Sequence, residues 1–256
     1  AAAVDYLQYP RDTLARKSGD CDDLSILFSA MLEDIGIGTA LVDVPGHVFI
    51  IFNTGVTEAE KNTLGFPDSL LVVHRGTVWV PVEMTLVGSS FTRAWQKGAE
   101  EYRDWSAKGK VEIIEVQTAW EQFRPVTLPP SDLKQIRVKQ AEIEAKYKDE
   151  LEALGRQRLS ALSAGYLAAL KKKPDDVSAL AQLGILYGEN GLTAEALAQF
   201  QKLLAVDKDN AMALNNIGNI YFLQERLDDA RQAYEASLKV EPGDTGVMAN
   251  LCRIRM

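Results

Sequence analysis

The chain has 256 residues, of which 46% are hydrophobic and 25% are charged, a composition typical of a globular protein with one or two domains. Its formal net charge of −8 disfavours a nucleic-acid partner, because phosphate binding needs a surplus of Lys and Arg on one face. No apolar run approaches the roughly 18 residues of a membrane-spanning helix, so we expect no transmembrane segment. Residues 1–9 lack the charged start and apolar core of a signal peptide, so any targeting segment would lie outside this chain.

The two cysteines, Cys21 and Cys252, stand near opposite ends of the chain and are not expected to form a disulfide. Cysteines and histidines show no clustered spacing, and the glycines do not form a phosphate-binding loop. We therefore expect no metal and no cofactor.

The periodicity changes at a proline-rich segment. Before about Trp120 the sequence mixes helical patterns with strand-like runs, and from about Ser131 every strong pattern is helical. Prolines 125, 129 and 130 favour extended backbone and block helix continuation. We therefore predict a first domain at 1–124, a linker at 125–131 and a helical domain at 132–256.

The first domain begins with a predicted helix that starts at Cys21 and ends before Gly36. Its expected inward stripe contains Cys21 and four apolar residues: Leu24, Phe28, Met31 and Ile35. Cys21 therefore begins a helix that faces the core.

Strands are predicted next, because residues 39–52 and 70–82 are rich in Val, Ile and Phe. Arg75-Gly76 is expected to form a hairpin turn, and Val48–Phe52 is apolar on both faces, as in a central strand. A second helix, marked by Phe91, Trp95, Ala99 and Tyr102, and a strand at 111–116 complete an α+β domain.

The second domain contains an internal repeat of 34 residues, at 177–210 and 211–244. The recurring positions pair Leu180 with Leu214, Leu183 with Ile217, Gly184 with Gly218, Tyr187 with Tyr221, Ala196 with Ala230, and Phe200 with Tyr234. This pattern resembles the tetratricopeptide repeat, which implies an all-α solenoid of antiparallel helix pairs.

The flanking segments fit the same solenoid. Residues 132–154 are predicted to form a charge-rich helix, and Tyr166, Ala169 and Pro174 fit the second helix of a degenerate unit. Downstream, Met248 and Leu251 fit the first helix of a partial unit. Cys252 falls where the full units have glycine and is interpreted as a packed thiol.

Cys21 lies at a helix N-terminus, where the unsatisfied N–H groups stabilise a thiolate. Asp20 is expected to cap the helix, while Asp22 and Asp23 fit its first turn. Because these carboxylates oppose ionisation of the thiol, activation would depend on a histidine.

His47 follows Pro45-Gly46 at the entry to an apolar strand, and Glu83 follows the strand that ends at Val82. If the two strands are neighbours, Glu83 can orient the imidazole, with Thr85 supporting it. The other histidine, His74, lies beside the Arg75-Gly76 turn and is interpreted as an exposed loop residue.

Gly-Asp-Cys-Asp, followed by an apolar helix, His47 and Glu83, resembles the transglutaminase-like superfamily, which has a papain-like fold. The resemblance covers about residues 9–102 and implies that Cys21 attacks an amide carbonyl, His47 exchanges the proton and Glu83 orients His47. The usual acid of that family is Asp. An oxyanion hole would use the N–H of Cys21 and a second donor, for which Gln8 is the candidate.

On the second repeat, Asn215, Asn216 and Asn219 lie where related repeats present a concave binding face, although ordinary helix surface is the competing interpretation. The basic residues of a carboxylate clamp are absent from the corresponding positions. Two functions are therefore compared. One is a cysteine-dependent hydrolase or transglutaminase acting on a protein or peptide, with repeats that dock a protein partner. The other is a catalytically silent peptide-binding scaffold. The family combination suggests a bacterial, extracytoplasmic setting.

Overall fold

The structure is a computed structural model that describes residues 6–125 and 139–254. Most of the predicted linker at 125–131, and the start of the helix predicted at 132, lie outside these described residues. The chain divides into two compact units, Ala1–Arg158 and Leu159–Met256. Among the described residues, no helix combines the length and apolar character needed to span a bilayer.

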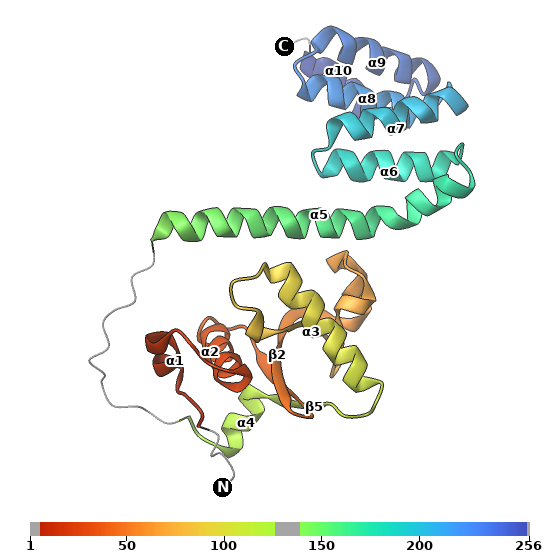
Figure 1. Ribbon diagram of the computed structural model, residues 1–256. Coiled ribbons are helices and arrows are strands. Elements are labelled where there is room, and N and C mark those ends of the chain that lie inside the picture. The colour runs from red at the N-terminus through yellow and green to blue at the C-terminus, as the bar shows by residue number, and fades with distance from the viewer. Residues whose placement is uncertain (1–5, 126–138, 255–256) are drawn as a thin grey trace. The chain divides into compact units, whose positions relative to one another are not determined.

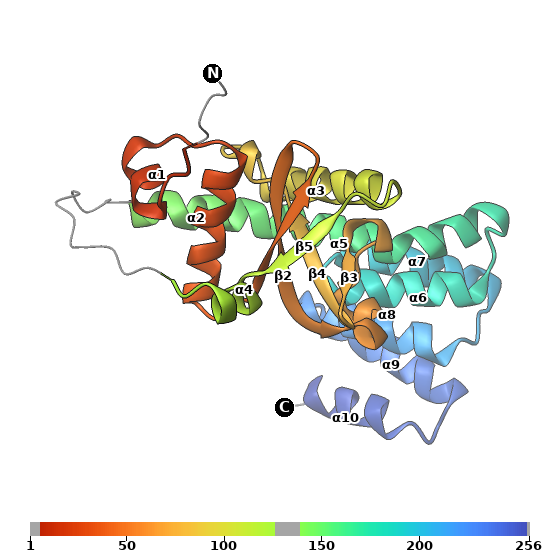
Figure 2. The same cartoon turned by 90° about the horizontal axis from the view of Figure 1, so that it is seen from below.

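The first unit is built on one antiparallel sheet, which is curled (Figures 1 and 2). The strand order is β3-β4-β2-β1-β5, and the strands are β1 (Thr39–Val44), β2 (His47–Thr57), β3 (Val72–His74), β4 (Thr77–Val82) and β5 (Glu112–Glu115). The predicted α+β pattern and the central strand are confirmed. Ile50 and Ile51 on β2 are both buried although they point to opposite faces.

The hairpin predicted at Arg75-Gly76 is confirmed. Both residues have positive φ, of 48° and 77°, as a type I′ hairpin turn requires. The turn between β1 and β2 is of another kind, because Pro45 has a negative φ and only Gly46, with φ of 78°, has a positive one. This second turn places His47 at the first position of β2.

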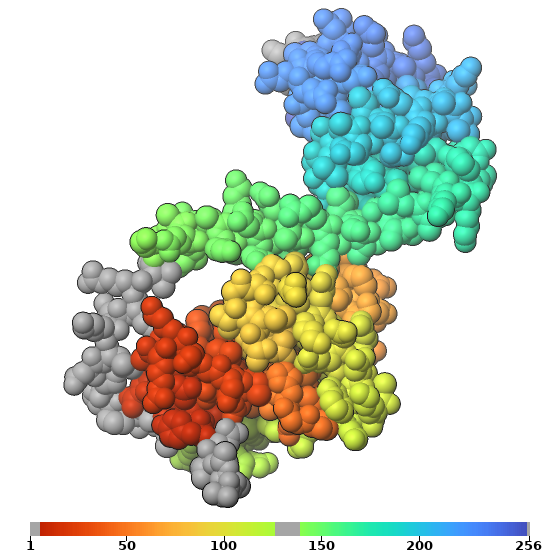
Figure 3. Space-filling model, viewed as in Figure 1, coloured from red at the N-terminus to blue at the C-terminus, as the bar shows by residue number. Residues whose placement is uncertain are grey.

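The α-helices described within residues 6–125 are α1 (Pro10–Arg16), α2 (Cys21–Asp34), α3 (Phe91–Ser106) and α4 (Val116–Gln122). Short 3-10 helices are η1 (Glu58–Leu64), η2 (Asp68–Leu70) and η3 (Met84–Leu86). Helices α1 and α2 gather at one end of this unit, drawn in red in Figure 3. The predicted helices at 21–35 and 91–102 are therefore present, and α2 begins at Cys21.

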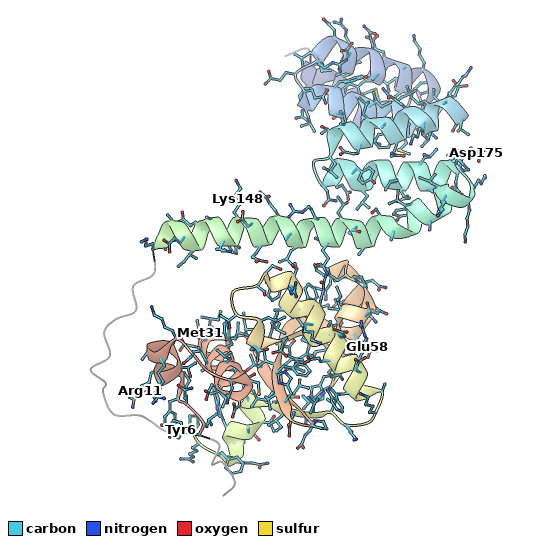
Figure 4. All side chains as sticks on the ribbon, viewed as in Figure 1. Tyr6, Arg11, Met31, Glu58, Lys148 and Asp175 are labelled. Atoms are coloured by element: carbon cyan, nitrogen blue, oxygen red, sulfur yellow. The ribbon has the colours of Figure 1, made fainter. Side chains whose placement is uncertain are left out.

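The apolar face of α2 differs from the predicted stripe. Leu24, Phe28 and Leu32 pack into the core at a spacing of four residues. Met31, labelled in Figure 4, is 52% exposed, and Ile35 is 69% exposed. The prediction was wrong for these two because the helix ends before Ile35, and because the row spaced by four residues, which contains Leu32, is the one that meets the sheet.

The core of the first unit has two parts, one on each face of the sheet. Phe49 and Ile51 belong to a cluster that also contains Ala40, Val42, Val44, Val72 and Trp79. Ile50 belongs to the other, with Val80, Val82, Met84, Ala94 and Trp95. Because α2 and the start of α3 join the second cluster, burial of apolar surface fixes both helices to β2 and β4.

The second unit contains the predicted repeats. Its helices are α6 (Val177–Glu189), α7 (Thr193–Val206), α8 (Ala211–Leu223), α9 (Leu227–Val240) and α10 (Thr245–Ile254). A Cβ added at Gly184 would lie 2.7 Å from the ring of Phe200, and one at Gly218 would lie 2.5 Å from the ring of Tyr234. The small residues therefore let an aromatic ring of the next helix approach the backbone.

Two predictions for the helical part need correction. The segment before the repeats forms one helix, α5 (Gln140–Lys172), instead of a charged helix that ends near Leu154 and a separate second one. No Pro interrupts it before Pro174, which explains its length. Cys252 is exposed and not packed, since no helix among the described residues covers the position that Phe200 and Tyr234 cover in the full units.

Candidate functional site

Asp20 and Asp23 fix the position of Cys21 at the N-terminus of α2. They form a reciprocal capping box, in which each side chain accepts a hydrogen bond from the backbone of the other residue. Cys21 is the first residue of the helix, so its N–H is a first-turn donor to which the helix offers no acceptor. The thiol is free and partly exposed.

The three carboxylates around Cys21 have separate roles. Asp23 is buried and accepts hydrogen bonds from the backbone N–H and the side-chain amide of Gln8. Asp22 accepts from the N–H of Asp23 at 3.1 Å. A hydrogen bond with Asp22, followed by burial, raises the pKa of Asp20 above its ordinary value. The three carboxylates that the sequence places beside the thiol therefore all accept hydrogen bonds at the start of α2.

His47 and Glu83 meet because of the register between β2 and β4. Ile50 pairs with Val82 in this antiparallel ladder, so the residue after Val82 lies opposite Phe49. His47 and Phe49 share a face, which places Glu83 diagonal to His47. The His47 Nε2 lies 2.6 Å from the Glu83 Oε2. The predicted pairing of these two side chains is confirmed.

Thr85 supports Glu83 from the other side, as predicted. The Oε1 of Glu83 accepts the Thr85 N–H at 2.8 Å and the Thr85 hydroxyl at 2.5 Å. Burial opposes ionisation of Glu83, but the bonds from Thr85 and His47 outweigh it and hold the pKa of Glu83 below its ordinary value. Glu83 is thus a buried, hydrogen-bonded carboxylate that orients the imidazole.

The bond from Nε2 to Glu83 leaves the His47 Nδ1 without a hydrogen bond among the described residues. Cys21 belongs to α2, which packs on β2, where the Ser25 hydroxyl donates to the Val48 carbonyl at 3.4 Å. No hydrogen bond joins the Cys21 Sγ to His47 in the part of the chain that the structure describes. The structure therefore shows the His47–Glu83 dyad formed and the thiol unbonded.

Glu101 is a residue of this site that sequence reasoning missed. Its Oε2 lies 3.4 Å from the His47 Nε2, and its Oε1 lies 3.3 Å from the Lys97 Nζ. Burial, followed by the negative charge of Glu83, raises the pKa of Glu101 above its ordinary value. A signal for it existed in Gly98, one helical turn before Glu101, where α3 approaches the sheet.

The second predicted oxyanion donor, Gln8, is engaged elsewhere. Its amide nitrogen donates to the Asp23 carboxylate and, at 3.4 Å, to the Ser18 carbonyl. Its Oε1 is buried without a hydrogen-bond partner. An oxyanion role for Gln8 stays a prediction, and it would require this amide to leave Asp23.

The described residues bring three possible metal-ligand atoms within 4.8 Å of one another in two places, His47-Glu83-Glu101 and Asp20-Asp22-Asp23. Contacts inside the protein involve both groups, and Glu101 takes part through its ion pair with Lys97. His47 Nε2 is bonded to Glu83, and the Asp side chains hold the capping box and Gln8. Neither arrangement requires an ion.

His74 is not the exposed loop residue that the sequence predicted. It ends β3, is only 18% exposed, and its Nε2 lies 2.7 Å from the Glu115 Oε1. The prediction was wrong because β3 and β5, the two edges of the sheet, come together where it curls. This contact makes His74 part of the closure of the sheet.

In the second unit, Asn216 and Asn219 line a cavity of about 270 Å³ with residues of α6, α7 and α8. The Asn219 Oδ1 accepts the Tyr234 hydroxyl at 2.8 Å and the Asn250 amide at 3.1 Å. The Asn216 amide donates to the Met212 carbonyl. Asn215 accepts from Asn250 at 3.4 Å and does not line this cavity.

The repeats of the second unit are similar to a known family. Residues 181–245 match the family model described as tetratricopeptide repeat. The second unit therefore contains tetratricopeptide repeats. A search of curated proteins found no match to the sequence.

Solved structures with similar chains include several tetratricopeptide-repeat proteins. The first such domain of Spaghetti (RPAP3), bound to an HSP90 peptide, is 16% identical, with 47% of this chain and 96% of that chain covered and a TM-score of 0.37. The Arabidopsis OM64 domain is 18% identical, with 45% and 90% covered and a TM-score of 0.37. An O-GlcNAc transferase of Thermobaculum terrenum is 22% identical, with 46% and 23% covered and a TM-score of 0.36.

Proposed function

We propose that the first unit is a cysteine-dependent acyl-transfer enzyme acting on amide bonds, and that the tetratricopeptide repeats dock its protein partner or substrate. The observation that carries the proposal is the 2.6 Å contact between the His47 Nε2 and the Glu83 Oε2. It fixes the ring with Nδ1 available as a base, on the strand against which the Cys21 helix packs. The assignment of a transglutaminase-like fold to the first unit is part of this proposal.

In the proposed reaction, the Cys21 thiol gives its proton to the His47 Nδ1 and its sulfur attacks the amide carbonyl carbon. The protonated ring then returns the proton to the leaving amine as the C–N bond breaks, and an acyl-thioester remains on Cys21. Water as acceptor completes hydrolysis, whereas an amine completes cross-linking. Glu83 stabilises the imidazolium throughout.

Cys252 provides a matched control for testing this proposal, because it is the other thiol and is exposed. A peptide-based electrophile that mimics an amide is expected to label Cys252→Ser at Cys21, and not to label Cys21→Ala. In the Cys252→Ser background, His47→Ala is expected to slow labelling by about 10²-fold, the effect of losing a positioned base. Equal labelling rates with and without His47 would contradict catalysis, provided that circular dichroism shows both variants folded.

A second candidate is the silent peptide-binding scaffold. The family match at 181–245 supports protein interaction more directly than it supports catalysis, and the unbonded Cys21 is consistent with an inactive thiol. The pH dependence of Cys21 alkylation separates the two functions. An alkylation midpoint near the free-thiol value of about 8.5, unchanged by His47→Ala, would favour the scaffold.

Docking by the repeats has its own test. Peptides selected from a displayed library on the full chain are expected to lose affinity by about 5-fold in Asn216→Ala, because each interfacial hydrogen bond contributes about 1 kcal/mol. Gln201→Ala, an exposed position on α7, is the control. Selected peptides that bind both variants equally would remove Asn216 from the docking surface.

A further inference from the structure

We propose that His47, Glu83 and Glu101 form a binding site for a divalent transition-metal ion such as Zn²⁺, and that the bound ion suppresses the thiol chemistry of Cys21. The metal site stands by itself, whereas the effect on Cys21 rests on the proposed function. The contact between His47 and Glu83 is complete without an ion. The ion is therefore a regulator that comes and goes, and not a resident cofactor.

Three elements each bring one ligand atom to the same point. His47 begins β2, Glu83 follows β4 and Glu101 lies on α3, and one ligand atom of each lies within 4.8 Å of the other two. The close packing of α3 on β4 fixes this arrangement, because a Cβ added at Gly98 would lie 2.8 Å from the Pro81 carbonyl carbon. Glu101 follows Gly98 by three residues and therefore lies on the same side of the helix.

One of the three ligand atoms has no hydrogen bond. The Oε2 of Glu101 is buried and unbonded, although it lies 3.4 Å from the His47 Nε2. The single N–H that Nε2 can carry points to Glu83 at 2.6 Å. The other oxygens are engaged elsewhere, since Thr85 bonds to the Glu83 Oε1 and the Lys97 Nζ lies 3.3 Å from the Glu101 Oε1. A proton on Nε2 thus satisfies one carboxylate, whereas a metal ion in its place bonds to both.

The second acidic group, Asp20-Asp22-Asp23, does not share these features. It contains no nitrogen ligand, and none of its oxygens is among the buried unbonded atoms of the described residues. An imidazole nitrogen together with a buried, unbonded carboxylate oxygen therefore distinguishes the site at His47.

The ligand set selects the class of ion. One imidazole nitrogen and two carboxylate oxygens suit Zn²⁺ and related first-row ions, whereas Ca²⁺ and Mg²⁺ take oxygen ligands. Bonds of about 2.0–2.2 Å in a tetrahedral zinc site hold the ligand atoms about 3.4 Å apart. The distance from the His47 Nε2 to Glu101 is already 3.4 Å. The distance to Glu83, now 2.6 Å, would widen by about 0.8 Å, and water would take the fourth position.

Binding of the ion moves a proton within the ring. The metal bonds to the lone pair of the His47 Nε2, so in the neutral ring the Nε2 proton transfers to Nδ1 and none is lost overall. In the proposed reaction, Nδ1 is the base that accepts the proton of Cys21. A ring that holds the metal on Nε2 and a proton on Nδ1 has no lone pair left for this step. Removal of the ion returns the proton to Nε2 and restores the base.

The site is tested by calorimetric titration of the full chain with Zn²⁺. The Cys21→Ser, Cys252→Ser background removes both cysteines as competing ligands, and one equivalent of Zn²⁺ is expected to bind. Glu101→Gln should weaken binding by about 10²-fold, because losing even a hydrogen-bonded neighbour of a ligand costs about 10- to 100-fold. Glu100→Gln is the matched control, since Glu100 also contacts Lys97 at 3.3 Å but is not a ligand. No binding, or equal affinity of the Glu101→Gln variant and its parent, overturns the site.

Side-chain ¹⁵N NMR of the same parent identifies the nitrogen that binds, since the sequence contains only His47 and His74. Zn²⁺ is expected to occupy the His47 Nε2 and to leave the proton on Nδ1. His74, bonded to Glu115, is the internal reference and should not change. This measurement decides the matter if Glu101→Gln does not fold, because Zn²⁺ that leaves the His47 signals unchanged overturns the inference.

The regulatory effect is tested by labelling Cys21 with the amide-mimicking electrophile in the Cys252→Ser background. Zn²⁺ is expected to stop labelling, a chelator should restore it, and Glu101→Gln should require about 10²-fold more Zn²⁺. Equal inhibition with and without Glu101 would mean that the ion binds the thiol itself, which overturns the regulation. Zn²⁺ bound at His47 with unchanged labelling would retain the metal site and reject the proposed function.

Discussion

The Glu83 carboxylate contacts the His47 ring at 2.6 Å across 36 positions of sequence, and one antiparallel register produces that contact. The same carboxylate is held by Thr85, so hydrogen bonds fix the position of both of its oxygens.

Glu83→Gln is expected to slow labelling of Cys21 by about 10²-fold, because the neutral amide no longer stabilises the imidazolium. The rate should be measured with the amide-mimicking electrophile in the Cys252→Ser background. Glu112→Gln, an exposed change on β5, is expected to leave the rate unchanged. If Glu83→Gln labels as fast as the parent, Glu83 has no part in activating the thiol.

Thr85→Val is expected to lower the free energy of unfolding by about 2 kcal/mol at pH 7, because it removes a hydroxyl bond to a buried carboxylate. The pKa of Glu83 is lowered on folding, so its contribution is present above the ordinary carboxyl range and is lost as the pH falls through the folded value. Urea denaturation at pH 7 and near pH 3 should therefore show a smaller difference in acid. Thr92→Val, on the exposed start of α3, is the control, and an equal loss in both variants would contradict this role for Thr85.

Glu101→Gln is expected to show the opposite pH dependence. Folding raises the pKa of Glu101, so its contribution is fully present below the ordinary carboxyl pKa and is lost as the pH rises through the folded value. Gln cannot ionise, so Glu101→Gln avoids the stability that the wild type loses as Glu101 ionises. The Tm of the first unit should therefore rise by about 2–4 °C at pH 8, equivalent to about 1 kcal/mol, and change little at pH 4. Calorimetry at both pH values tests the sign, and a lower Tm at pH 8 would contradict it.

Gly98→Ala is expected to destabilise the first unit by about 1–3 kcal/mol, because the added Cβ meets the backbone of Pro81 and Val82. Gly155→Ala is the matched helical control, since nothing lies within 4 Å of its added Cβ, and it should stabilise by about 1 kcal/mol. Chemical denaturation of the two variants should give opposite signs. A neutral Gly98→Ala would mean that α3 can shift without cost.

Local patterns predicted much of the fold. The start of α2 at Cys21, the turn at Arg75-Gly76 and the central position of Val48–Phe52 all follow from short-range rules of capping, turn geometry and strand burial. The contact between His47 and Glu83 was also predictable, because each residue stands at the end of an apolar strand. The 34-residue period predicted the repeats, because the spacing that packs Gly184 against Phe200 recurs in the next unit.

Features that depend on contacts between elements distant in the sequence were not predictable. His74 is half-buried because the sheet curls until β3 meets Glu115 on β5, and no local pattern encodes that curl. Glu101 belongs to the site because α3 lies close to β4 at Gly98. The glycine in the sequence signals a close approach, but it does not name the strand that α3 approaches. The exposure of Met31 depends on which row of α2 meets the sheet, a choice that helical periodicity leaves open.

The two asparagines in the repeat cavity have complementary hydrogen-bonding capacity. The oxygen of Asn219 is taken by Tyr234 and Asn250, and the amide nitrogen of Asn216 is taken by Met212. Within the described residues this leaves an NH₂ group on Asn219 and a carbonyl oxygen on Asn216 without partners. One donor and one acceptor on α8 match in kind the C=O and N–H of a peptide group, so these two neutral side chains complement the polar atoms that every peptide main chain carries.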